Sequence, residues 1–447
     1  MAKRPDVVTM TYNVADILNA IRNGASVDYR NYVPVAVDNA DSVKEIGATI
    51  LALPALQNEF VNSLVNRIGR VLITSRLYEN PLRMFKKGIL ELGEVVEDIF
   101  VRLAEPFTYD AEKAETELYK RVAPDIKTAF HIVNFKKFYK VTVERQQLEL
   151  AFISYEGVGN LITKIIEQLY TAMNYDEFLV TKYMLAKNIL DGKVKAITVT
   201  DDPKAVVSAI KGVSNKFTFL SPDYNLVGVE NYSDKTSQYL ITNSDFDAVM
   251  DVEVLASAFN MDKAEFMGRR VLIDSLGALD IARLEKLLGD EVDISTDELE
   301  ALRAIPAVLL DENYFMIFDK LIEMRDAENG QGLYWNYMLH NWKIFSTSPF
   351  APVCVFVPEV PIVTGVSITP SEATVARGGS TNLTANVDTE NFAPKSVTWT
   401  SDTEGVTVSA SGVVTVGADV EQGTQATITA TSTFDAEQSA TATITVA

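Results

Sequence analysis

The sequence feature that most constrains the fold is a change of composition at "VPEVPIVTG", residues 357–365. Two prolines and a glycine stand in this stretch, and such residues typically separate elements or domains. Before it the chain mixes charged, aromatic and aliphatic residues, whereas Thr, Ser, Ala and Val dominate after it. A chain of 447 residues is long enough for two or three domains. We therefore predict a large N-terminal part, a linker that ends near residue 361, and a separate domain over 362–447.

Short apolar and polar residues alternate along residues 362–447, which is the pattern of half-buried strands. The alternating pairs are Val366/Ile368, Ala385/Val387, Val406/Val408, Ile428/Ala430 and Ile444/Val446. Turn signals such as Gly378-Gly379 and Ser411-Gly412 separate them. Several short strands at this spacing predict a β-sandwich, with Trp399 as the anchor of its core.

The N-terminal part mixes helical and extended patterns and is predicted to be α+β. Apolar residues at helical spacing predict a helix that Gly24 ends and a long helix over 158–190 with a restart at Asp176. We expect strands in "KAITVT" and "VGVENY" and a strand, turn and strand in "PAVLLDENYFMIFDKL". Extended segments predict a long hairpin within 70–120, and Asp262 with Glu265 predicts a capping box.

Charge and cysteine content limit the classes of function. The chain has 40 Lys and Arg against 61 Asp and Glu, a formal net charge of −21. Such a surface repels nucleic acid and anionic membranes on average, although it suits a container whose wall must not grip DNA. Cys354 is the only cysteine, so no internal disulfide can form, and we expect it to be a small buried apolar residue. We find no signal-peptide apolar region and no apolar run of membrane-spanning length, so we expect a soluble product.

A search for catalytic and metal-binding patterns predicts none. The two histidines, His131 and His340, have no neighbouring carboxylate in sequence that would hold a catalytic base. Asp245, Asp247 and Asp251 lack the spacing and the glycine of a calcium loop. We also find no phosphate-binding glycine-rich loop, and so predict no catalytic, cofactor or metal site and no enzyme.

Two further patterns have alternative interpretations. Lys136, Lys137 and Lys140 alternate with aromatic residues, as in a nucleic-acid stripe or in a strand with one packed and one solvated face. The aromatic run "GLYWNYMLHNWKIF", which starts at Gly332, either lines a pocket or belongs to the core or a subunit contact.

The tail resembles the bacterial immunoglobulin-like group 2 module. The residues that carry the resemblance are "GVSITPSEATVARGG", "VTWTSD" and "VTVSASGVVTV", and it covers about the last 85 residues. The rest of the chain resembles the major capsid proteins of phi29-like short-tailed phages, through "ILNAIRN", "SLVNRIGRV", "NPLRMFKKG", "DVEVLASAFNMDKAEFMG" and "GLYWNYMLHNW".

The second resemblance implies the Hong Kong 97 capsid fold. Its parts would be an arm over 1–60, an extended loop and peripheral domain with a spine helix over 61–193, an axial domain over 194–340, and a return to the peripheral domain with a linker over 341–361. It further implies a shell of hexamers and pentamers around double-stranded DNA, assembled in the host cytoplasm with a scaffolding protein and a portal, and without binding to membranes. The immunoglobulin-like domain would face outward, toward a head fibre or the host surface. An encapsulin-type shell and a bacterial surface adhesin are the alternatives.

Overall fold

The computed structural model describes residues 14–60, 63, 78–90, 95–108, 121–146, 149, 152, 157–200, 202–250, 269–289 and 292–447, and for 157–166 the backbone alone. It divides into two compact units. The first contains Met1–Glu94, Ile132–Phe178 and Ile317–Phe345, and the second contains Val95–His131, Leu179–Met316 and Ser346–Ala447.

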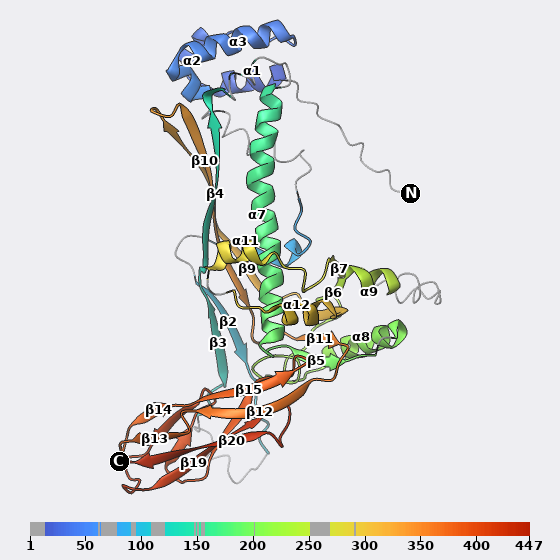
Figure 1. The fold of residues 1–447 in the computed structure, drawn as a ribbon, viewed down its shortest axis with the longest axis vertical. Coiled ribbons are helices and arrows are strands. Elements are labelled where there is room, and N and C mark those ends of the chain that lie inside the picture. Colours follow the sequence, from blue (N-terminus) through green and yellow to red (C-terminus); the bar gives the residue numbers. More distant parts are fainter. Residues whose placement is uncertain are drawn as a thin grey trace. The chain divides into compact units, whose positions relative to one another are not determined.

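A four-stranded sheet forms the frame of the first unit, in the order β1-β9-β10-β4. Strand β1 runs parallel to β9, and β4 runs antiparallel to β10. Figure 1 shows β4, β9 and β10 as long strands that run together. The bounds are β1 Lys86–Ile89, β4 Phe135–Glu144, β9 Phe315–Asn329 and β10 Tyr334–Thr347.

Three helices at the start of the described chain supply much of the core of the first unit. They are α1 (Val14–Gly24), α2 (Val27–Tyr32) and α3 (Ala40–Ala52). Helix α1 ends at Gly24 as predicted, and the apolar positions of its helical pattern are buried. Side-chain caps begin the next two helices: Ser26 Oγ accepts from Tyr29 N at 3.1 Å, and Asn39 Oδ1 accepts from Ser42 N at 2.7 Å.

The predicted long helix is present as α7 (Gly157–Leu190), one continuous helix of 34 residues (Figure 1). The restart expected at Asp176 is therefore not a boundary. Leu169 and Met173 of this helix join the core that the N-terminal helices form with Trp335 and Tyr337 of β10. None of the described helices combines the length and the apolar character that crossing a membrane requires.

The second unit contains a five-stranded sheet in the order β5-β11-β8-β6-β7. Its strands are β5 Lys195–Thr198, β6 Gln238–Asn243, β7 Arg270–Ile273, β8 Ala307–Asp311 and β11 Val353–Val357. Four described helices accompany it: α8 Pro203–Phe217, α9 Ser244–Val249, α11 Ile281–Leu288 and α12 Thr296–Arg303. The predicted strand, turn and strand appear as β8 and β9, and "KAITVT" contains β5.

Residues 362–447 form three small sheets around one apolar core, as the alternating pattern predicts. The pairings are β12 with β15, β13-β20-β19-β16, and β14-β18-β17. The bounds are β12 Ile362–Thr369, β13 Glu372–Val375, β14 Ser380–Asn382, β15 Thr384–Glu390, β16 Val397–Ser401, β17 Val406–Val408, β18 Val413–Val416, β19 Gln425–Ser432 and β20 Ser439–Val446. Trp399 is only partly buried and packs against this core, whose centre is aliphatic, so it is not the anchor that we expected.

The structure differs from other expectations too. "VGVENY" is not a strand, because its only ladder contact is the isolated bridge between Ser221 and Asn231. The hairpin expected within 70–120 instead pairs β2 (Val96–Val101) with β3 (Ile126–His131). Strand β11 lies between β5 and β8 in the sheet of the second unit, and the expected return of 341–361 to the peripheral domain stays a prediction. The expected capping box at Asp262 and Glu265 lies outside the described residues.

Candidate functional site

The β2–β3 hairpin exposes one apolar face. Pairing places Val101 opposite Ile126, Ile99 opposite Thr128, and Glu97 opposite Phe130. Alternate residues of each strand are exposed, and four of them are large and apolar. These four define the hairpin outer face: Ile99 (54% exposed), Val101 (54%), Ile126 (51%) and Phe130 (65%). A soluble monomer rarely leaves such a face uncovered, so the hairpin outer face is a candidate contact surface.

The opposite face of the hairpin is anchored within its own unit. The ring of Phe100 stacks on that of Phe350, with centroids 5.8 Å apart. Ser348 Oγ donates a hydrogen bond to Asp98 Oδ2 at 2.5 Å. Arg102 forms ion pairs with Asp125 at 3.3 Å and with Glu230 at 3.0 Å. The hairpin is thus fixed through one face and presents the other.

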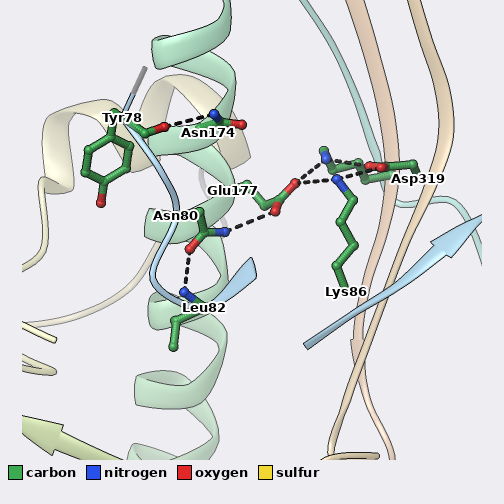
Figure 2. A network of polar contacts seen from close by, with 8 residues as sticks. Tyr78, Asn80, Leu82, Lys86, Asn174, Glu177 and Asp319 are labelled. Atoms are coloured by element: carbon green, nitrogen blue, oxygen red, sulfur yellow. Dashed lines mark hydrogen bonds and ion pairs between the residues drawn. The ribbon is translucent and has the colours of Figure 1, made fainter. Parts of the chain in front are cut away.

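A second cluster, in the first unit, consists of the buried Glu177, Asp319 and Lys343 with the partly buried Lys86, which together we call the ion quartet (Figure 2). Lys343 Nζ, fully buried, contacts Asp319 Oδ1 at 2.5 Å and also binds Glu177 Oε2. Lys86 Nζ lies 2.5 Å from Asp319 Oδ2 and 3.2 Å from Glu177 Oε2. Asn80 Nδ2 donates to the other oxygen of Glu177 at 3.0 Å. The four charges balance, which is the condition under which buried ions are tolerated.

The surrounding charges favour the ionised forms of Glu177 and Lys86. Burial by itself raises the pKa of Glu177, but Lys343 and Lys86 outweigh it, so the pKa lies below its ordinary value. Burial likewise opposes the charged form of Lys86, yet Glu177 and Asp319 raise its pKa above the ordinary value. The quartet therefore joins β1, α7, β9 and β10 by ion pairs.

A polar pocket of about 410 Å³ opens beside the ion quartet. It is lined by Glu79, Asn80, Arg83, Lys86, Gly88, Asn174 and Glu177. Asn174 Nδ2 already donates to the carbonyl of Tyr78 at 2.9 Å, and the amide oxygen of Asn80 accepts from Leu82 N at 2.8 Å (Figure 2). These contacts position the segment that precedes β1 against α7. Apart from Gly88, the lining consists of charged and amide side chains, and several of them hold neighbouring segments together through these contacts.

The two histidines occupy different environments. His131 is 3% exposed, and its Nδ1 lies 2.7 Å from Ser346 Oγ. No carboxylate stands next to His131 in the sequence, but Asp98 Oδ2 lies 3.9 Å from Nε2. Only the register of the hairpin brings the two together, so Asp98 was missed. His340 is half-buried, and its ring centroid lies 5.6 Å from that of Phe138.

The aspartates that we considered for a metal are not brought together where the structure describes them. Asp247 is buried and bonded to Thr242 Oγ1 at 3.0 Å and to Arg270 Nε at 3.1 Å. Asp245 is exposed, and Asp251 lies outside the described residues. Among the described residues no group of three or more acidic, histidine or cysteine side chains could hold an ion.

The remaining candidate residues belong to strands with one packed face. In β4, Lys136, Phe138 and Lys140 are exposed while Phe135 and Val143 are buried, so the strand has one packed and one solvated face. Lys136 Nζ lies 5.3 Å from the centroid of the Trp342 ring, as in a cation–π pair. The aromatic run forms β10, and Trp335 and Tyr337 are core residues. Cys354 is fully buried, and burial raises the pKa of its thiol.

Comparisons with known proteins agree with this geometry. A family model described as the Phi29-like phage major capsid protein matches residues 18–357, and a model of the bacterial Ig-like domain (group 2) matches residues 362–446. The chain is 36% identical to the major capsid protein of Bacillus phage B103, over 92% of this chain and 88% of the relative. It is 31% identical to that of Streptococcus phage Cp-1, over 75% of this chain and 92% of the relative.

Among solved structures, a chain in the capsid structure of Staphylococcus phage Andhra superposes with a TM-score of 0.51 at 14% identity, covering 64% of this chain and 86% of that one. The match confirms the fold, and the family models confirm both resemblances. The chain therefore belongs to the family of phi29-like phage major capsid proteins, with a Hong Kong 97-type capsid fold and a C-terminal immunoglobulin-like domain of group 2.

Proposed function

We propose that this capsid protein assembles in the host cytoplasm into a closed head shell of hexamers and pentamers that encloses double-stranded DNA. The observation that carries the proposal is the hairpin outer face, because Ile99, Val101, Ile126 and Phe130 are exposed in the single chain. A neighbouring copy that covers these side chains would remove their apolar surface from water, which stabilises association by about 25 cal/mol per Å². Many such contacts, repeated with curvature, close a shell.

The domain assignment within this proposal follows the capsid fold. We assign residues 1–60 to an arm and the β2–β3 hairpin to the extended loop, the two elements that reach a neighbouring copy. We assign the sheet that contains β6 and β8 to the axial domain. Helix α7 then serves as the spine, and the ion quartet ties β1 and the strands β9 and β10 to it.

The charge of the chain supports a container rather than a DNA-binding protein. A net charge of −21 gives little counterion release on contact with DNA. We therefore propose that the shell encloses DNA without binding its sequence. A scaffolding protein and a portal are the partners that we propose for closure and for DNA entry.

We propose that the immunoglobulin-like domain stands on the outside of the shell, where it meets a head fibre or the host surface. An interior domain would take volume from the genome. The Cp-1 relative aligns over 92% of its own length but over only 75% of this chain, which supports a capsid body that functions without part of this sequence.

We propose a structural role rather than an enzymatic one. The contacts of His131 tie a hairpin to its unit, and those of Lys86, Glu177, Asp319 and Lys343 tie strands to a helix. An encapsulin-type shell and a surface adhesin are the alternative functions that the sequence left open, and the family match supports neither.

The proposal is tested by placing a charge on the hairpin outer face. We expect Phe130→Asp to prevent the formation of closed particles when the chain is co-expressed with its scaffolding protein, as seen by negative-stain microscopy. Phe434→Asp is the matched control, because Phe434 is also exposed, at 45%, but lies in the tail domain. Closed particles of the Phe130→Asp variant in wild-type yield would contradict the proposal.

A further inference from the structure

The root of the hairpin contains a small buried polar cluster that the hairpin outer face does not use. Asp98 of β2 accepts a hydrogen bond from Ser348 Oγ at 2.5 Å. His131 of β3 shares one with Ser346 Oγ, 2.7 Å from its Nδ1. Each strand of the hairpin is therefore hydrogen-bonded to the segment 346–350 through one of these side chains.

One atom of this cluster lacks a partner. Among the residues that the structure describes, none forms a hydrogen bond with the buried His131 Nε2, although Asp98 Oδ2 lies 3.9 Å away. That distance is too long for a hydrogen bond. A neutral imidazole carries a proton on only one ring nitrogen, whereas the protonated ring donates from both. Where the neutral ring carries its proton on Nδ1 and donates it to Ser346 Oγ, Nε2 gains a donor proton for this carboxylate only when the ring is protonated.

We propose that the hairpin root is a proton-dependent clasp, in which protonation of His131 adds a charge-assisted hydrogen bond from Nε2 to Asp98 and tightens the hairpin against residues 346–350. The side chains of Asp98 and His131 are then hydrogen-bonded to each other as well as to that segment. Charge-assisted bonds are about twice as strong as neutral ones. Histidine side chains exchange this proton between about pH 5 and 8.

The charged groups around the cluster favour this response. Asp98 is the carboxylate that faces His131 from β2, and burial, which would raise its pKa, is outweighed by His131 and Ser348, so the pKa is lowered. The lowered pKa favours the ionised form of Asp98, the form that accepts this hydrogen bond. Residues 346–350 contain no charged side chain. Lys127, on the same strand, lies four residues before His131, and its positive charge helps to lower the pKa of Glu230.

The clasp would control how much the hairpin, and with it the hairpin outer face, moves relative to residues 346–350. The added hydrogen bond fixes the direction of the hairpin while His131 is protonated, and loss of that proton loosens it. This inference does not depend on shell assembly, because it concerns one chain and can be measured on the unassembled protein. Its failure would leave the proposed function intact.

The test is hydrogen–deuterium exchange of the full-length unassembled chain at about pH 5.5 and 7.5, corrected for the intrinsic pH dependence of exchange. We expect the amides of β2 and β3 to gain about tenfold protection at the lower pH, the factor that one added hydrogen bond contributes. Amides of β8, in the fully buried strand of the same unit, serve as the internal reference.

Two variants remove the clasp from opposite sides. His131→Gln keeps a polar group near Ser346 but cannot take up the proton, and Asp98→Asn removes the anion. Both should lose the pH-dependent gain in protection. His340→Gln, which leaves His131 as the only histidine, should retain it. If His131→Gln fails to fold, Asp98→Asn still decides. The proposal is overturned if the wild-type hairpin shows no pH-dependent protection, or if the gain persists in a folded His131→Gln or Asp98→Asn variant.

Discussion

Replacement of Lys343 by methionine should destabilise the first unit severely. The Nζ of Lys343 is fully buried and contacts both Glu177 and Asp319. Its removal leaves two carboxylates with Lys86 as the remaining cation, so one negative charge is buried without compensation. Breaking a buried ion pair from one side costs about 3–5 kcal/mol, a large fraction of the stability of a typical domain.

The assay can be confined to the first unit through its tryptophans. Of the three in the chain, Trp335 and Trp342 lie in the first unit and Trp399 in the tail. Urea unfolding followed by tryptophan fluorescence in a Trp399→Phe background therefore reports the free energy of unfolding of the first unit. Lys140→Met, at an exposed position of β4, is the control and should change that free energy by less than about 0.5 kcal/mol.

A double variant separates lost charge balance from lost packing. Lys343→Met with Glu177→Gln removes one cation and one anion and leaves the 2.5 Å pair between Lys86 and Asp319. We expect the double variant to be more stable than the sum of the single effects by about 1–3 kcal/mol, the coupling typical of contacting residues. Additive effects, or a Lys343→Met loss no larger than that of Lys140→Met, would refute the reasoning.

Four further predictions concern the rest of the molecule. The contribution of Glu177 and Lys86 to the free energy of unfolding should be constant between about pH 5 and 10. The lowered pKa of Glu177 means that its contribution is lost only in acid, and the raised pKa of Lys86 means that its contribution is lost only in base; a steep change within that range in the urea assay would contradict this. Gly412→Ala should destabilise the tail more than Gly423→Ala, although both glycines have positive φ (83° and 87°). A Cβ at 412 would lie 2.2 Å from the carbonyl oxygen of Leu383, whereas one at 423 meets nothing within 4 Å. Hydrogen exchange of β14 and β18 measures the difference, and equal effects of the two substitutions would contradict the close approach at 412. The free subunit should bind random duplex DNA only weakly at physiological salt, since its net charge is −21, and tight binding in a fluorescence anisotropy titration would disprove it. A chain that ends near Val360 should still form particles visible by negative stain, and failure of its capsid body to fold would show that the tail belongs to that body.

Local patterns predicted the elements whose signal is contained in neighbouring residues. The helical spacing of Val14, Ile17, Leu18 and Ile21 predicted α1 and its buried face. Alternation of short apolar residues predicted the strands of the tail, and the turn at Gly412 has the positive φ that glycine tolerates. The prediction of a strand in "VGVENY" was wrong because a strand needs a partner along its length. This segment is a loop with one bridge.

The candidate sites were beyond the reach of sequence patterns because distant segments build them. Lys86 and Glu177 are 91 residues apart, and Lys343 and Glu177 are 166 apart. Nothing near any of these residues in the chain indicates a partner. Similarly, the approach of the Asp98 and His131 side chains depends on the register of the hairpin. We expected that hairpin within 70–120, whereas its strands pair between residues 96 and 131.

A high-resolution electron microscopy map of the assembled head tests the central claim most directly. It should show closed shells in which Ile99, Val101, Ile126 and Phe130 of each copy are buried against a neighbouring copy. A shell in which these four side chains face solvent would contradict the account.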